Sequence, residues 1–543
     1  MKAVLAAALG ALVVVGWGLS GRGALGVRDE WTIVPNGTVW PLSAWGLPLV
    51  VLVLFGGAAA LSVYDRFRRA KNRREQLNST RTALVALALL ALLWPWTLLG
   101  PGALARQNVD AARTTERVTL EGRFNVLASL WSDVATQYFG QAYEITDARA
   151  FCRTYAATQQ KPTSRFLTHI ATHPPGATLL FLGARRFAEG VPGVGGALNS
   201  LAARLTGVDE AQLPAQLELA RRGASARYLL PDPPPLPPGA AGVALLCAFG
   251  MGASLVLALP AVYGLATAGA LNPDEAEARG LFACALWALA PTLNLFAFSL
   301  DAVVAALVAW TLFFAARAAT TGRRRWAVLA GVGLAAATML SFGALVVGGL
   351  VVGAWILLRV PGTVRLTALS VGAFVAAWGV AAAWGGFNPL EVAFQAKEAH
   401  RFATLAVRSH AVWAGMNLLV WAAFCGSALV VATLGGALRA KELIIKSGTP
   451  KSAGTGLASR KPAPTPAALT PLAFALATLA LLVVLTVSGQ VRGEVERLWL
   501  FLLCPLCACV RVPGGKTATA LVVLQGVQTL FMAATLAPLV RPF

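Results

Sequence analysis

Charged residues are scarce in this sequence. They make up 13% of its 543 residues, whereas a soluble domain usually carries roughly a quarter. A chain with so few charges cannot cover the surfaces of about three or four aqueous domains, although its length alone would allow them. Hydrophobic residues reach 57%, which excludes a disordered chain, and seven cysteines are too few for a disulfide scaffold. The composition predicts an all-α polytopic membrane protein.

Acidic residues are the scarcer of the two charged classes. Asp and Glu number 24 against 45 Lys and Arg, a net charge of +21. The basic residues lie in short segments beside apolar runs, as the positive-inside rule predicts. We therefore expect a lipid bilayer, and no nucleic acid, as partner. The group Cys504, Cys507 and Cys509 is embedded in apolar sequence and indicates packing rather than a zinc site, whereas Cys152 alone falls in a polar loop.

Apolar runs of membrane-spanning length recur along the chain. The first is expected to be an uncleaved anchor, and the run 326–358, with arginines at both ends, a hairpin of two short helices turning near 341–343. The segment 176–188 is either a span or re-entrant, which decides the side of loop 190–239. The sequence thus predicts 13 or 14 transmembrane helices, from the runs 3–19, 44–63, 83–99, 240–268, 281–298, 302–316, 326–358, 366–386, 411–438, 472–487, 498–510 and 517–540.

Basic segments divide the chain into three parts and assign the sides of its loops. Residues 1–82 are expected to form a transmembrane hairpin and a basic cytoplasmic loop. Residues 83–358 would form a central transmembrane module with an external loop at 101–172. Residues 359–543 would supply the remaining helices, an external loop at 387–410 and a cytoplasmic linker at 439–470.

Two motifs in the first long external loop carry a resemblance. Trp131-Ser132-Asp133-Val134-Ala135-Thr136-Gln137-Tyr138 is followed about forty residues later by His173-Pro174-Pro175-Gly176, which opens an apolar segment. Further on, Asp301 lies at the turn between two apolar runs. In order and spacing, residues 83–358 resemble the GT-C integral-membrane glycosyltransferases, in particular the protein O-mannosyltransferase and aminoarabinose transferase branch (glycosyltransferase family 39-like).

The resemblance implies a GT-C-type bundle with amphipathic helices in its external loops and a catalytic central module. It implies a polyprenyl-phosphate sugar as donor and a glycan, lipid or protein as acceptor, at the outer face of a bacterial inner membrane. Asp133 would be the general base. No cofactor is implied with certainty, and a divalent metal is not indicated. The candidates for binding substrate are Tyr138, His173 and Asp301, together with Arg497, Arg492 or Arg401 as the cation that binds the donor phosphate.

Several alternatives stay open at this level. The family often has paired acids, and the literal pair Asp29-Glu30 is the alternative catalytic candidate, although no Pro-Pro element follows it in its own loop. Asp133 could instead cap a helix, and Arg497 could be an interfacial anchor. A polytopic transporter or lipid flippase is the rival function, but transporters usually place ionisable groups near the bilayer midplane. Here the acids concentrate in external loops.

Overall fold

The computed structural model describes most of the chain, in segments separated by gaps. Asp29, Glu30, Asp133 and most of the expected linker 439–470 lie outside the described residues. The described segments are 2–20, 25–27, 31–33, 42–68, 73–99, 105–106, 119–120, 122–132, 137–160, 169–227, 234–270, 272–406, 408–436, 469–510 and 515–536.

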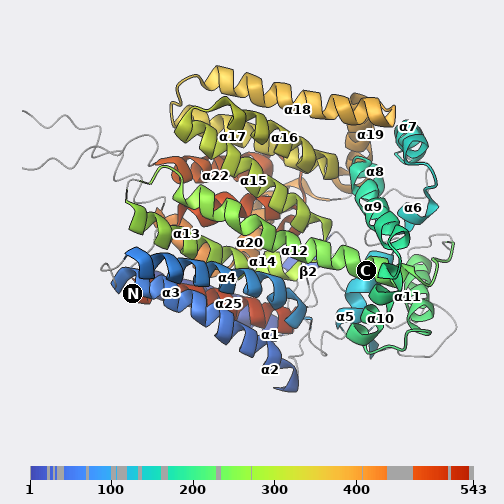
Figure 1. Cartoon of the computed structure of the whole chain (residues 1–543), viewed down its shortest axis with the longest axis horizontal. Helices are drawn as coiled ribbons and strands as arrows, with labels where there is room; N and C mark the ends of the chain where they lie inside the picture. The colour runs from blue at the N-terminus through green and yellow to red at the C-terminus, as the bar shows by residue number, and fades with distance from the viewer. Residues whose placement is uncertain are drawn as a thin grey trace, which may run out of the picture.

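Long apolar helices run side by side and form the body of the molecule (Figure 1). Apolar residues from all three sequence parts share one buried core. Within the bundle, α12 is central, with 67% of its apolar window buried, whereas only 11% of α18 is buried. The helices of the bundle are α1 (Lys2–Ser20), α2 (Leu42–Val51), α3 (Gly57–Arg68), α4 (Arg73–Thr97), α12 (Ala240–Thr267), α13 (Pro273–Ala288), α14 (Pro291–Leu295), α15 (Leu300–Thr321), α16 (Arg324–Leu340), α17 (Val346–Leu357), α18 (Thr363–Gly385), α20 (His410–Cys425), α22 (Thr470–Ser488), α24 (Leu503–Cys509) and α25 (Gly515–Thr535).

Eight of the described helices are long and apolar enough to cross a membrane, or nine if a pair bent by 103° counts as one span. That pair is α20 and the helix Ser427–Gly436. The sequence expectation of 13 or 14 is higher because several apolar runs form shorter helices. These are α13 with 16 residues, α16 with 17, and the apolar stretches Phe342–Leu357 and Leu500–Cys509. The all-α polytopic architecture is confirmed.

Local sequence explains where the helices end in two of the expected apolar runs. The hairpin within 326–358 turns where expected, because α16 ends at Leu340 and the chain is extended at Ser341 before a 3₁₀ turn, Phe342–Leu345. The single run 281–298 was expected to be one helix, and that is wrong. Instead, α13 begins earlier, at Pro273, where the side chain of Asn272 caps its N-terminus, and it ends at Ala288. A second, short helix, α14, starts at Pro291.

A layer of shorter helices covers one end of the bundle (Figure 1). It has its own apolar core, packed against the first half of α12. We call this end the site end, and the opposite end, which carries Arg323–Arg325 and Arg359, the arginine end. The layer consists of α5 (Gly122–Trp131), α6 (Tyr138–Glu144), α7 (Ala148–Thr158), α8 (His169–Thr172), α9 (Gly176–Gly190), α10 (Val194–Thr206) and α11 (Leu213–Arg227).

Helix α9 resolves the ambiguity about segment 176–188. It has 15 residues and is not among the described helices that qualify as spans. Its apolar face, with Phe181 and Leu182, is buried in the core of the site-end layer, and Figure 1 shows it crossing the end of the bundle. Segments 137–160 and 194–227 therefore lie at the same end, as the re-entrant alternative requires.

Three further short elements lie outside the bundle's long helices. These are α19 (Pro389–His400), the π-helical turn Arg401–Leu405 and α23 (Val495–Leu498). Two short antiparallel strand pairs complete the described structure: β1 (Leu25–Val27) with β2 (Trp31–Ile33), and β3 (Ala105–Arg106) with β4 (Thr119–Leu120).

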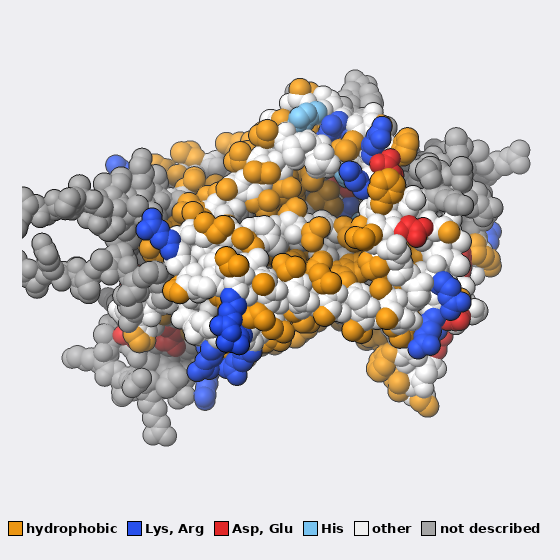
Figure 2. All heavy atoms as spheres, turned by 90° about the horizontal axis from the view of Figure 1, so that it is seen from above, with side chains coloured by type: hydrophobic (Ala, Val, Ile, Leu, Met, Phe, Trp, Pro, Cys, Tyr) orange, Lys and Arg blue, Asp and Glu red, His pale blue; other side chains and the backbone are white. Residues whose placement is uncertain are grey.

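Charge is distributed along the bundle as a membrane protein requires. Figure 2 shows one face with apolar side chains across its middle and Lys, Arg, Asp and Glu gathered toward the two ends. The same view shows a hollow toward the site end with basic side chains beside it. A bilayer therefore surrounds the middle of the bundle, and the charged groups lie at the depth of its two surfaces.

Candidate functional site

Two arginines and two carboxylates form an ionic cluster at the site end. Nη2 of Arg497, on α23, donates to Glu494 Oε2 at 2.8 Å, and its Nε lies 3.5 Å from Asp301 Oδ2 in the first turn of α15. The other oxygen of Glu494 accepts from Arg408. All four side chains are largely but not fully buried, with exposures between 11% and 22%. We call Asp301, Arg408, Glu494 and Arg497 the ionic cluster.

Arg497 is held in place by its carboxylate neighbours. Burial lowers the pKa of its guanidinium, but Asp301, Glu494 and the nearby Glu496 raise the pKa by more, so it lies above the ordinary value. The group is therefore permanently charged. Its Nη1 has no hydrogen-bond partner among the described residues. An anion at this position would meet a cation whose orientation is already fixed.

The loop between α22 and α23 is held in place through its backbone carbonyls. His410 Nε2 lies 3.0 Å from Val487 O, and His400 Nε2 lies 2.8 Å from Gln490 O. Asn417 Nδ2 donates to Val491 O at 2.8 Å, while its Oδ1 accepts from Gly493 N at 3.2 Å. Three side chains of the segment 400–417 thus fix the course of this loop.

Two arginines complete this bracing. Arg492 donates to the carbonyls of Gly489, Leu405 and Arg408, at 2.9, 2.9 and 2.6 Å. In return, Arg408 donates to Arg492 O as well as to Glu494. Sequence analysis proposed Arg492 as a candidate ligand of the donor phosphate. In the structure its guanidinium instead donates to these backbone carbonyls.

The loop turns into α23 through two left-handed residues. Gly493 has φ +81°, and a Cβ there would lie 3.0 Å from the Trp413 ring, so glycine suits the position on both counts. Glu494 follows with φ +58°, in a region that few non-glycine residues adopt. Strain of this kind persists only where the surroundings enforce it. In this conformation the Glu494 carboxylate contacts both arginines.

Tyr138 connects the ionic cluster to the His173-Pro174-Pro175 motif. Burial raises the pKa of its hydroxyl well above the usual value, Tyr155 and Asp301 raise that pKa further, and Arg497 lowers it. Asp301 and Arg497, two members of the ionic cluster, thus both act electrostatically on this hydroxyl. On its other side, the Tyr138 ring lies 5.7 Å from the His173 ring, edge to face.

The histidine motif itself is fixed by a buried tyrosine. Tyr155 of α7 donates to the carbonyls of both Ile170 and His173, at 2.9 and 3.0 Å. Nδ1 of His173 lies 3.0 Å from Thr172 Oγ1. Gly176 then starts α9 against α16, where any side chain would overlap the Met339 carbonyl. The backbone of the motif is thus held in one conformation beside the ionic cluster.

The segment that contains Asp133 has described flanks on both sides. Gln137 N donates to Ser132 O at 3.4 Å, so the two flanks lie close together. Gln137 has φ +54° and leads directly into Tyr138 at the start of α6. The chain on either side of Asp133 therefore lies beside the tyrosine that contacts His173. The position of Asp133 itself stays a prediction.

The remaining candidates are placed as follows. Tyr138, His173, Asp301 and Arg497 lie together. Arg401 does not join them: its side chain is 68% exposed and lies 3.6 Å from Glu398 of the preceding helix. Asp29 and Glu30 fall between β1 and β2, and β1 lies against α20, the helix that provides Asn417.

Sequence analysis missed Arg408, Glu494 and Asn417. Asn417 was detectable, because it is a lone amide in the apolar run 411–438 and polar groups inside membrane segments are functional candidates. Arg408 and Glu494 carried no comparable signal. They are 86 residues apart, and only the fold shows that they form a pair.

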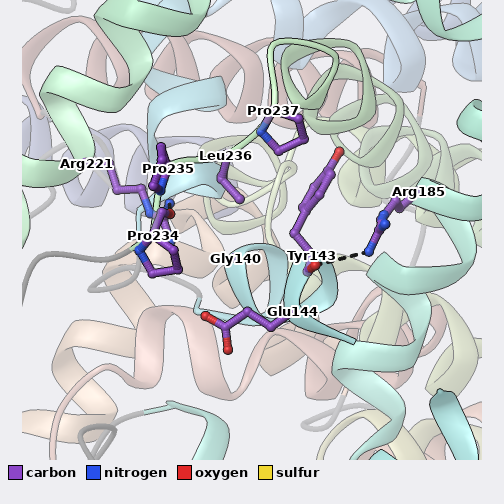
Figure 3. A pocket seen from close by; sticks show the side chains of 9 residues that line it. All are labelled: Gly140, Tyr143, Glu144, Arg185, Arg221, Pro234, Pro235, Leu236 and Pro237. Atoms are coloured by element: carbon purple, nitrogen blue, oxygen red, sulfur yellow. Dashed lines mark hydrogen bonds between the residues drawn. The ribbon is translucent and has the colours of Figure 1, made fainter. Parts of the chain in front are cut away.

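A separate cavity of about 240 Å³ lies at the far end of α6 (Figure 3). Tyr143 and Glu144 line it together with Arg185, Arg221 and the segment Pro234–Pro237, which contains three prolines and Leu236. Both arginines bind backbone carbonyls: Arg185 contacts Ala142 O and Tyr143 O, and Arg221 contacts Pro234 O. The cavity and Tyr138 therefore occupy opposite ends of one seven-residue helix.

Among the described residues, no group of three or more His, Cys, Asp or Glu side chains is arranged to hold a metal ion. Cys504 and Cys507 are buried, and Cys509 is half-buried. Comparison with known proteins gives no family whose model matches this chain and no curated protein similar to it. The function has to be argued from the site itself.

Proposed function

We propose that the protein is a membrane glycosyltransferase of the GT-C type, which moves a sugar from a polyprenyl-phosphate carrier to an acceptor at the site end. The observation that carries this proposal is Arg497. Its guanidinium is oriented by Asp301 and Glu494, its Nη1 has no hydrogen-bond partner within the described part of the chain, and it lies where the apolar bundle meets the polar layer. A lipid phosphate, whose chain lies in the bilayer and whose head lies at its surface, fits such a position.

The proposed reaction needs a base and a stabilised leaving group. The acceptor hydroxyl attacks the anomeric carbon, forming a new C–O bond, while the bond from that carbon to the phosphate oxygen breaks. The hydroxyl proton passes to the Asp133 carboxylate, and the departing polyprenyl phosphate takes the electron pair. Arg497 would stabilise the negative charge that grows on this phosphate. Tyr138 and His173 would border the sugar.

The side of the membrane follows from charge. Arg323–Arg325 and Arg359 lie at the opposite end from the ionic cluster, and the positive-inside rule therefore favours the external face for the cluster. In a bacterial inner membrane this is the periplasmic face. The acceptor would then be a glycan, lipid or protein of the cell envelope.

The carboxylate assignment is tested by two matched variants. Asp133→Asn keeps the shape and removes the basicity, so the transfer rate should fall by a factor on the order of 10² to 10⁴. Donor affinity should change far less, because the base acts mainly in the transition state. Asp29→Asn is the control and should keep most activity. The reverse result would move the base to Asp29, and full activity in both variants would remove the general-base mechanism.

One observation favours the rival function, a transporter or flippase. The span formed by α20 and Ser427–Gly436 is broken at Gly426, and discontinuous helices mark the substrate sites of many transporters. In transporters, the freed backbone groups bind the cargo. Here Gln525 donates to Cys425 O and accepts from Leu429 N, and Gln528 accepts from Ser427 N. The protein itself occupies these backbone groups, which supports transfer over transport.

A further inference from the structure

Helix α19 carries an exposed stripe that the bundle does not cover. Its opposite face, Val392, Ala396 and Ala399, is buried, and α19 packs against α7 and α8. On the outer face, Leu390 is 80% exposed and Phe394 61% exposed. Such large apolar side chains at i and i+4 on the surface indicate a contact outside the protein.

The C-terminal half of the same stripe is basic. Lys397 and Arg401 follow Leu390 and Phe394 at positions i+7 and i+11, so all four lie on one helical face. Arg401 is 68% exposed. Phe402, in the π-helical turn that follows, is 51% exposed. An apolar half next to a cationic half is the pattern of helices that lie in the headgroup region of a bilayer.

The apolar surface continues onto a membrane span. Helix α18 exposes Val375 at 59%, Val380 at 72% and Trp384 at 45% along its length. Trp384 is the penultimate residue of α18, and tryptophan concentrates at the membrane–water interface. Leu390 follows it by six residues. The exposed stripe of α19 therefore starts at the depth of the interface and continues the lipid-facing surface of α18.

We propose that α19 is an interfacial helix: Leu390, Phe394 and Phe402 insert among the acyl chains at the site end, and Lys397 and Arg401 contact anionic lipid headgroups. Because α19 leads through Arg401–Leu405 directly to Arg408, this contact would tie the ionic cluster to the membrane surface. The proposal does not depend on the reaction that the protein catalyses.

The test is the environment of a fluorophore at position 394. Phe394→Cys is labelled with an environment-sensitive dye and reconstituted in vesicles that contain phosphatidylglycerol. The wild-type chain, whose seven cysteines are buried or half-buried, sets the background. Val375→Cys on α18 is the lipid-facing control, and Leu219→Cys on α11, where Leu219 is 46% exposed, is the control on the site-end layer.

The dye at position 394 should be quenched by lipids spin-labelled near the headgroup and protected from aqueous iodide. Position 375 should respond to lipids labelled deeper in the chain, and position 219 to iodide. Lys397→Glu combined with Phe394→Cys should weaken the lipid quenching in anionic vesicles. The proposal is overturned if position 394 behaves like position 219. It is also overturned if position 394 is protected from both quenchers, since a protein would then cover the stripe.

Discussion

Two polar regions of the bundle differ in kind. The ionic cluster at the site end consists of charged groups that are 11–22% exposed and surround a strained backbone. One nitrogen of its Arg497 guanidinium has no partner among the residues that the structure describes. The glutamine pair Gln525 and Gln528, inside the bundle, is neutral and at most 1% exposed, and it binds the backbone at a helix break. Charge placed at a membrane surface suits a reaction there, whereas neutral, satisfied amides in the interior stabilise the fold.

Of the two regions, the ionic cluster is expected to show the larger effect when it is altered. Arg497→Ala removes a charge-assisted hydrogen bond to the donor phosphate, worth about 1.5–3 kcal/mol, so donor affinity should fall about 10- to 100-fold. Arg497→Lys should lose nearly as much, because a compact ammonium cannot contact Asp301, Glu494 and the phosphate at once as the planar guanidinium does. Binding of a polyprenyl-phosphate sugar to protein in nanodiscs measures both.

Arg222→Ala is the control for that measurement. Arg222 is an exposed arginine of α11 paired with Glu218, and its loss should leave donor binding unchanged. If Arg497→Ala stays folded and its donor affinity is unaltered, another cation binds the phosphate. The ionic cluster would then be as purely structural as the glutamine pair.

A smaller effect, on stability alone, is expected in the interior. Gln525→Leu leaves the buried Cys425 carbonyl and Leu429 amide without partners, and unfolding in detergent should become easier by about 1–3 kcal/mol. Activity per folded molecule should persist. Val523→Ala, on the lipid-facing side of the same helix, should change stability much less. A stable Gln525→Leu variant that loses all activity would place function at the helix break.

The smallest effect concerns accessibility. Cys152 is fully buried in α7, and burial raises the pKa of its thiol to about 11. Only the thiolate reacts, so labelling of Cys152 should be slow near pH 8 and should speed up as the pH rises. The expectation from sequence that Cys152 lies in an open polar loop is wrong.

Labelling of Cys152 therefore cannot report which side of the membrane the site end faces, and the test needs a cysteine at another position. Glu189→Cys, at a side chain that is 48% exposed on α9, should react with an impermeant reagent in intact cells, while Cys152 stays silent. Protection of position 189 until the cells are opened would place the site end inside.

Sequence analysis captured what depends on local pattern. Apolar length predicted the helices of the bundle, arginines predicted its two ends, and the turn at Ser341 was predicted from its flanks. It also named Tyr138, His173, Asp301 and Arg497, which lie together. It did not predict the pairing of Arg408 with Glu494 or the use of Arg492 as a backbone brace, because both depend on contacts between segments more than 80 residues apart.

The number of transmembrane helices could not be predicted from the sequence either, because it too depends on contacts between distant segments. Hydropathy cannot tell a full span from a shorter apolar helix that is buried by its neighbours, as with α13 and α24. Nor could it decide whether α9 crosses the bilayer, since that depends on the core that α9 shares with α6.

The most direct test of the central claim is sugar transfer by the purified wild-type protein in nanodiscs, from a polyprenyl-phosphate sugar to an envelope acceptor. The account predicts that glycosylated acceptor and free polyprenyl phosphate appear in equal amounts. If no such donor is consumed, while the protein in sealed vesicles moves a lipid or solute from one side to the other, the account is contradicted and the protein is a transporter.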